Sequence, residues 1–148
     1  MQRSKAEVYL HFVWATKRRL PLITPEVERG VYRCIASESK RLGCLVLGIG
    51  GMPDHVHLVL KTTTTLSPAR IMQYVKGASS RYVQEQFPHT AFSWQENYGV
   101  FSVTRSHLER VLAYVHGQKE HHASGRLWPE WEDAWETVVD TSPADHAS

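Results

Sequence analysis

The amino-acid sequence predicts an α+β fold, in which an antiparallel sheet packs against helices. Two observations carry this prediction. Short runs that alternate between apolar and other residues are typical of strands, and longer segments with apolar residues three and four apart are typical of helices. They occur in the order strand, helix, strand, strand, helix, strand, and one more helix follows. This order is the split βαβ arrangement of ferredoxin-like (RRM-like) domains, with a C-terminal helix appended.

Residues 8–15 predict the first strand of the sheet. Apolar side chains such as Phe12 and Trp14 occupy one face of this segment, while His11 and Val13 lie on the other face. A basic turn follows the strand and consists of Lys17, Arg18 and Arg19.

Two long helices are predicted for residues 25–42 and 68–86. Pro25 and Pro68 suit the first position of a helix, because the backbone N–H that proline lacks is not needed there. Gly43 follows the first helix and can adopt the positive φ with which many helices end.

The remaining elements include a hairpin, a fourth strand and a last helix. Residues 44–50 and 55–61 are strand-like runs, and the segment 51–54 between them is a turn, so we expect a hairpin. Residues 98–103 predict the fourth strand. The last helix is expected between residues 104 and 122.

The length of 148 residues leaves room for one domain, which we assign to residues 1–125. The segment 126–148 carries Trp128, Trp131 and Trp135 at a helical spacing. We expect an amphipathic segment there that docks on the domain and ends in a frayed tail.

Composition and charge exclude several classes of protein. Apolar residues make up 42% and charged residues 22% of the chain, as in globular domains. The longest apolar run, residues 42–52, is shorter than the roughly 18–20 residues of a membrane helix. The N-terminal residues do not resemble a secretory signal, so we expect a cytoplasmic protein. Cys34 and Cys44 lack metal-binding spacing and are expected to be reduced core residues.

His55 and His57 form the first candidate site. They are two residues apart on a predicted strand, so both imidazoles project from one face, while Val56 and Leu58 project from the other. We expect the apolar face to be the buried one. Two neutral imidazoles provide half of a metal site that lacks a third donor. The alternative is a pair of partly exposed strand histidines without a ligand.

The last predicted helix carries the second group of candidates. Tyr114, Gln118 and His121 line one flank of its apolar stripe. A tyrosine at this position is either half-buried packing or a nucleophile, and Gln118 and His121 are by default solvated. Spacing alone does not exclude Tyr74 or Tyr82 as the nucleophile.

Four motifs in this sequence resemble a known family. They comprise Met52–Leu58 (MPDHVHL), the segment 71–81 with Lys76-Gly77 and Ser79-Ser80-Arg81, Trp94–Val103 (WQENYGVFSV), and Tyr114 with Gln118 and Glu120-His121-His122. In this order and spacing they resemble the single-tyrosine HUH transposases of small bacterial insertion sequences, over about residues 8–122. Two features depart from the family pattern: Gly117 stands where related chains often have Asn, and the C-terminal tail is rich in tryptophan and acidic residues.

The resemblance implies a function and a set of roles. His55 and His57 would hold a divalent metal ion, Mg²⁺ or Mn²⁺, and Gln118 would complete the ligand set. Tyr114 would attack a phosphodiester of single-stranded DNA and form a 5′-phosphotyrosine, and His121 would support the site from the same flank. The resemblance also implies a homodimer whose sheets join edge to edge and that recognises hairpins at the ends of its element.

Candidate DNA contacts are basic residues and one aromatic residue, namely Lys17, Arg18, Arg19, Lys76, Arg81 and Trp94. Ordinary solubilising charge and core packing are the alternatives for these side chains, and a net charge of +2 does not by itself indicate nucleic-acid binding. Two other functions remain open. One is a non-catalytic, domesticated protein that binds hairpins or single strands, and the other is a metallohydrolase in which activated water attacks.

Overall fold

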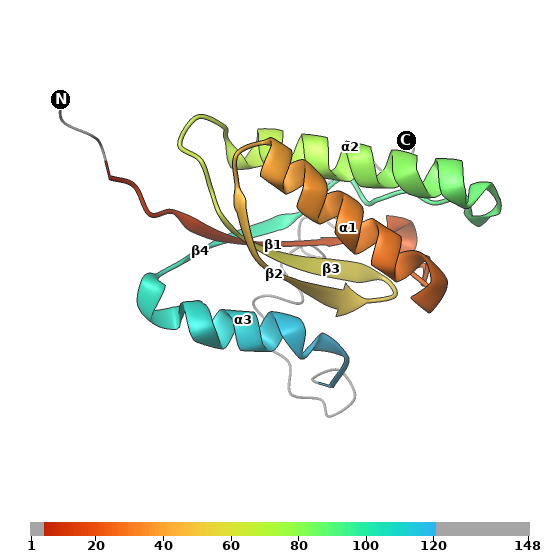
Figure 1. Ribbon diagram of the computed structural model, residues 1–148. Coiled ribbons are helices and arrows are strands. Elements are labelled where there is room, and N and C mark those ends of the chain that lie inside the picture. Colours follow the sequence, from red (N-terminus) through yellow and green to blue (C-terminus); the bar gives the residue numbers. More distant parts are fainter. Residues whose placement is uncertain (1–4, 121–148) are drawn as a thin grey trace.

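The computed structural model describes residues 5–120, and its elements follow the predicted order (Figure 1). The helices and strands are β1 (Tyr9–Ala15), α1 (Pro25–Arg41), β2 (Leu45–Met52), β3 (His55–Lys61), α2 (Pro68–Gln86), β4 (Gly99–Val103) and α3 (Leu108–His116). Short 3₁₀ turns lie at Lys17–Arg19, Pro88–Thr90 and Arg105–His107. The predicted α+β fold and its element order are confirmed.

The four strands form one antiparallel sheet in the order β2-β3-β1-β4. The predicted hairpin pairs β2 with β3, and β1 lies between β3 and β4. The register places Val13 opposite His57, and it places His11 opposite both Val59 of β3 and Phe101 of β4. Residues opposite one another share a face of the sheet, so His11 and His57 lie on the same face.

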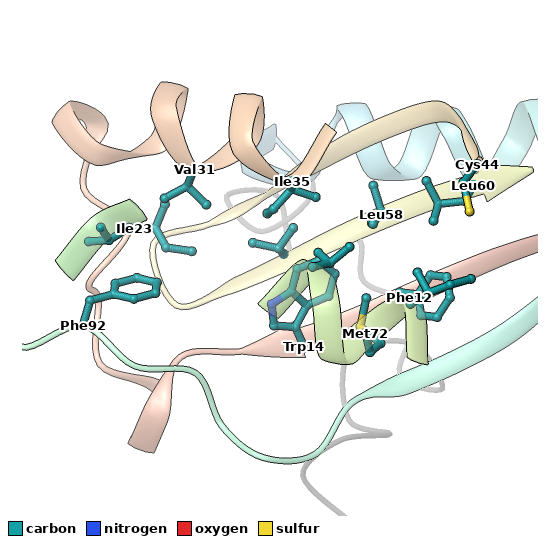
Figure 2. Close-up of a cluster of buried hydrophobic side chains, with 14 of the residues drawn as sticks. Phe12, Trp14, Ile23, Val31, Ile35, Cys44, Leu58, Leu60, Met72 and Phe92 are labelled. Carbon is teal, nitrogen blue, oxygen red and sulfur yellow. The ribbon is translucent and has the colours of Figure 1, made fainter. Parts of the chain in front are cut away.

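Helices α1 and α2 cover one face of the sheet, and α3 lies against the other (Figure 1). The larger core fills the space between the sheet and the first two helices, where the indole of Trp14 packs with the aliphatic side chains of β3 and α1 (Figure 2). Its fully buried members include Phe12, Trp14, Val31, Ile35, Leu58, Leu60 and Ile71.

A smaller core lies beneath α3, where Val111 and Val115 pack against Val59 of β3. Because α3 covers this face, His55 and His57 have no exposed surface. The expectation that only the apolar face of this strand is buried is therefore wrong. Both faces of β3 are buried, and the histidines lie in the layer between the sheet and α3.

Glycines on β2 allow α3 to approach the sheet closely. A Cβ atom on Gly50 would lie 2.0 Å from the backbone oxygen of Val115, and one on Gly48 would lie 2.8 Å from the Leu112 side chain. Any larger residue at position 50 would have to push the helix backbone away. The close packing of α3 against the sheet thus depends on the absence of a side chain at Gly50.

We expect Gly50→Ala to lower the free energy of unfolding by about 1–3 kcal/mol, the usual cost of overpacking against an unyielding neighbour. Gly77→Ala is the matched control, because Gly77 lies within α2 and a Cβ there meets nothing within 4 Å. It should raise the unfolding free energy by about 0.5–1 kcal/mol through helix propensity. Urea unfolding of both variants measures the difference, and equal stabilities would contradict the close-approach argument.

The structure also corrects two local expectations. The sequence predicts a last helix that runs to residue 122, but α3 ends at His116. Gly117 interrupts the helical backbone at φ −95° and ψ 20°, and residues 118–120 are helical again. Both cysteines are free thiols, but Cys34 is only half-buried, so the expectation of a core residue holds for Cys44 alone. The segment 126–148 lies outside the described residues.

The predicted helix ends are mostly confirmed. Gly43 has a φ of +89°, as its position after α1 predicts, and the Ser67 side chain accepts a hydrogen bond from the backbone N–H of Arg70. In the part of the chain that the structure describes, no helix is long and apolar enough to cross a membrane.

Candidate active site and metal centre

His55 lies at the start of β3, and polar groups contact both of its ring nitrogens. Its Nδ1 atom lies 2.8 Å from a carboxylate oxygen of Asp54, and its Nε2 atom lies 3.1 Å from Oε1 of Gln118. A carboxylate only accepts hydrogen bonds, so Nδ1 of His55 carries a proton. This contact fixes the orientation of the ring and turns Nε2 toward Gln118.

Asp54 belongs to the turn between β2 and β3 and links His55 to the basic turn. Arg19 Nε lies 3.2 Å from the second carboxylate oxygen. Partial burial raises the pKa of the Asp54 carboxyl group, but the hydrogen bond to His55 and the nearby positive charges lower it, and the pKa lies below its usual range. Asp54 is therefore ionised near neutral pH and can accept a hydrogen bond from Nδ1–H of His55.

His57 lies two residues further along β3, in the same buried layer. Its ring centroid is 5.1 Å from that of His55, with an angle of 73° between the ring planes. Its Nδ1 atom lies 2.8 Å from Nε2 of His11 on the neighbouring strand β1. The sequence places His11 on a strand face with Val13 but does not mark it as a site residue, because only the strand register brings it beside His57.

Tyr114 lies on α3 against His57. Its ring meets the ring of His57 edge to face, at a centroid distance of 5.8 Å, and only 2% of the residue is exposed. The two rival tyrosines, Tyr74 and Tyr82, lie on α2, across the sheet from this layer. Of these three tyrosines, Tyr114 is the one whose ring contacts a strand histidine, which spacing alone could not decide.

Gln118 completes the layer just beyond the end of α3. Its amide nitrogen donates a hydrogen bond to the backbone oxygen of Tyr114 at 3.3 Å, and this contact directs its Oε1 atom toward His55. The residue is 1% exposed, so the default expectation of a solvated glutamine is wrong. The interruption at Gly117 precedes this turn of the chain.

The donor set fits a divalent ion. Two imidazoles and one amide oxygen lie in one buried layer, where His55 Nε2 faces Gln118 Oε1 and the ring of His57 lies beside that of His55. Among residues 5–120, no group of three or more His, Cys, Asp and Glu side chains gathers as a metal site. Gln118 Oε1 is the oxygen donor that lies beside His55, and mixed nitrogen and oxygen donors suit Mg²⁺ or Mn²⁺ as well as zinc.

Several of the candidate DNA contacts form a turn just after β1, where Arg19 pairs with Asp54. The backbone N–H of Lys17 donates to Ser93, and that of Arg18 donates to the side-chain oxygen of Gln95. Arg18 and Arg19 both adopt positive φ, at 57° and 55°, which is uncommon for residues other than glycine. The basic turn therefore has a defined conformation against the segment 93–96.

Lys76 anchors the same segment from α2. Its ammonium group donates to the backbone oxygens of Gln95 and Glu96, and burial lowers the pKa of Lys76 to about 8, although the charge of Glu96 acts in the opposite direction. Lys76 and Trp94 line an open pocket of about 480 Å³.

Trp94 is half-buried and serves packing as well as the pocket. Its Nε1–H donates to the Ser79 hydroxyl at 2.9 Å, and its ring meets Trp14 and Phe92 edge to face. Arg81 is exposed on α2, and its positive charge helps to lower the pKa of Glu38 on α1. DNA contacts by these residues stay predictions, and His121 lies outside the described part of the chain.

A comparison with protein families decides what this arrangement belongs to. The family model described as "Transposase IS200 like" matches residues 4–118, which is most of the chain. The chain belongs to the IS200-like transposase family. The resemblance to single-tyrosine HUH transposases is thereby confirmed, and the protein is a DNA transposase of an insertion-sequence type.

Curated relatives agree with this membership. This IS200-like transposase is 25% identical over 129 residues to the ISDra2 transposase TnpA of Deinococcus radiodurans. The match covers 81% of this chain and 92% of the relative. It is 26% identical over 121 residues to the transposase for insertion sequence element IS200 of Salmonella typhimurium, with coverage of 78% and 79%.

Solved structures share the fold. A protein of Deinococcus radiodurans R1 described as a transposase superposes with a TM-score of 0.63 at 26% identity, over 78% of this transposase and 98% of that chain. A REP-associated tyrosine transposase bound to a REP hairpin superposes with a TM-score of 0.57 at 12% identity, over 78% and 68% of the two chains. The second likeness supports the fold alone.

Proposed function

We propose that this transposase cuts and rejoins single-stranded DNA through a covalent bond between Tyr114 and a 5′-phosphate. The observation that carries the proposal is the convergence of four side chains within one chain: His55, His57, Tyr114 and Gln118 lie in one buried layer between β3 and α3. A nucleophile beside a nitrogen and oxygen donor set is an arrangement that suits metal-assisted phosphoryl transfer.

The metal ion would be held by Nε2 of His55, Nε2 of His57 and Oε1 of Gln118. When bound, a divalent ion supplies Lewis-acid stabilisation of the charge that develops on the scissile phosphate. None of the three ligands is anionic, so they leave the positive charge of the ion undiminished. Asp54 holds the His55 ring in place from the other side.

Tyr114 supplies the nucleophile in this proposal. Its phenolic oxygen forms a bond to the phosphorus while the bond to the 3′-oxygen of the preceding nucleotide breaks, and the phenol proton passes to a base. The departing 3′-oxygen takes up a proton and becomes a hydroxyl. The phosphotyrosine preserves the energy of the broken bond, so that a DNA 3′-hydroxyl can reverse the step and join a new strand.

DNA must reach a site that is closed in this structure. His55, His57, Tyr114 and Gln118 are at most 2% exposed, so binding of a phosphate requires the end of α3 to move from the sheet. Lys119 closes this end, because its ammonium group pairs with Glu28 of α1 at 2.7 Å and also contacts the backbone oxygen of Gly51. Both of these side chains are partly exposed, so the contact is weak enough to open.

The DNA-binding surface would start at the basic turn next to Asp54. The basic turn 17–19 contacts the segment 93–96 and Asp54, and its side chains would bind DNA phosphates. Lys76 and Trp94 line the pocket next to the segment 93–96. Arg81 would contribute charge along α2. We extend hairpin recognition to this chain because the family resemblance implies it, and a structural neighbour of the same fold is bound to a REP hairpin.

A homodimer belongs to the same proposal. Strand β4 is an edge of the sheet, and Val100 on this strand is 37% exposed. An edge strand presents unpaired backbone groups to a second copy, and pairing of the two edges would extend the sheet. Sedimentation equilibrium measures the assembly, and a monomer at all concentrations would contradict this part of the proposal.

A denaturing gel tests the proposed reaction. Single-stranded DNA with a hairpin and a label downstream of the cleavage position is incubated with the protein and Mn²⁺, and the products are separated after denaturation. We expect a labelled band that migrates with the protein, that protease removes, and that does not form in the presence of a chelator. Cut DNA without this band would favour the metallohydrolase, and retarded but intact DNA would favour the non-catalytic binder.

A further inference from the structure

His11 makes a contact that the proposed reaction does not yet use. It lies in the middle of β1 with no exposed surface, and its Nε2 atom is 2.8 Å from Nδ1 of His57. The two rings are nearly parallel, at 25°, with centroids 5.1 Å apart. The strand register accounts for the contact, because His11 and His57 are diagonal neighbours on one face of the sheet.

The hydrogen bond between the two imidazoles has two possible directions. If Nε2 of His11 donates, then neutral His57 carries its proton on Nε2, and that nitrogen cannot bind a metal ion. If Nδ1 of His57 donates, then Nε2 of His57 has a lone pair for the ion, and neutral His11 carries its proton on Nδ1. The choice of direction therefore decides whether His57 is a ligand.

His55 shows the direction that the site uses. Its Nδ1 atom faces the Asp54 carboxylate, which can only accept, so Nε2 is the nitrogen directed toward Gln118. His57 has the same local arrangement two residues later, with His11 in the place of the carboxylate. Histidines that bind metal ions commonly donate their other ring N–H to a carboxylate, a backbone carbonyl or water. At His57, the acceptor within reach of that N–H is Nε2 of His11.

We infer that His11 is a positioning residue for the metal site. It accepts the Nδ1–H of His57 and thereby makes Nε2 of His57 the metal-binding nitrogen, as Asp54 does for His55. This inference rests on the proposed metal site. It gives His11 a role that neither its strand position nor its burial requires.

A purely structural role for His11 makes a different prediction. Its ring also packs against Phe101 of β4, at a centroid distance of 5.9 Å, so replacing it could alter packing alone. His11→Phe keeps a ring of similar shape and removes both nitrogens. His11→Gln provides an amide oxygen that can accept from His57, and Phe101→Leu perturbs the packing around His11 without removing the hydrogen bond.

The first measurement is the affinity of the DNA-free protein for Mn²⁺, determined by titration calorimetry. We expect His11→Phe to weaken Mn²⁺ binding by about 10- to 100-fold, the usual effect of losing the partner of a metal-bound histidine. His11→Gln should lose less, and Phe101→Leu should bind as the wild type does. Wild-type affinity in folded His11→Phe would overturn the inference and leave the proposed function intact.

The tautomer of His57 in the metal-free wild type provides the second measurement, since nitrogen chemical shifts distinguish a proton on Nδ1 from one on Nε2. We expect the Nδ1–H form, and the Nε2–H form would overturn the inference even if His11→Phe fails to fold. A wild type that binds no Mn²⁺ would instead contradict the proposed metal site itself. The two failures are therefore distinguishable.

Discussion

Tyr114→Phe should abolish formation of the covalent protein–DNA band and lower strand cleavage by about 10³-fold or more, because the substitution removes the attacking oxygen. The ring and its edge-to-face contact with His57 remain, so Mn²⁺ binding should be unchanged. The unfolding free energy should change by about 1 kcal/mol at most, since only a hydroxyl is lost. The measurement is the denaturing gel, run with labelled single-stranded DNA.

Two matched substitutions control for the loss of a tyrosine hydroxyl. Tyr74→Phe and Tyr82→Phe alter the rival tyrosines on α2, and both variants should form the covalent band as the wild type does. Tyr74 contacts Arg41 and Arg70, and the Tyr82 ring packs beside Gly30 of α1, so neither hydroxyl is placed for the reaction. Loss of the band in Tyr82→Phe, with the band retained in Tyr114→Phe, would refute the assignment.

His57→Ala should also abolish cleavage, but for a different reason. The substitution removes one of the three proposed ligands, so Mn²⁺ binding should be lost with the activity. Binding of a hairpin oligonucleotide should change little, because phosphate contacts lie on basic side chains and not on the histidines. Calorimetry with Mn²⁺ and gel retardation with the hairpin measure the two effects separately.

His107→Ala is the matched control, because His107 is an exposed histidine on the turn before α3. It should leave cleavage and Mn²⁺ binding unchanged. Removal of His57 leaves a cavity and takes away the partner of His11, so the circular dichroism spectrum and melting temperature of His57→Ala must be compared with the wild type. If folded His57→Ala retains cleavage, the metal has no role at this position.

Local periodicity explains why much of the fold could be predicted. The alternation of β3 places His55 and His57 on one face, and helical spacing places Tyr114 and Gln118 on one flank of the last helix. Both relations depend on residues close in the chain. Proline and glycine likewise mark the helix ends locally, so the element order was predicted correctly.

The remaining features depend on contacts between distant segments. Helix α3 can cover its face of the sheet because Gly50 lets the backbone of Val115 approach closely. The sequence shows a glycine inside an apolar run but does not show which segment packs against it. The pairing of His11 with His57 requires the register of β1 against β3. Helix α3 ends before Gly117, and the buried residue Gln118 follows this interruption. The helical stripe that the sequence predicts up to residue 122 is therefore broken at Gly117.

In the proposed reaction, one tyrosine beside two strand histidines becomes covalently attached to DNA. Digestion of the protein–DNA product with nuclease and trypsin, followed by mass spectrometry, locates the attachment. The peptide 111–119 contains Tyr114 as its single tyrosine, and we predict that this peptide carries the phosphonucleotide. A phosphonucleotide on the peptide that contains Tyr74 or Tyr82, or cleaved DNA with no modified peptide, would contradict the account.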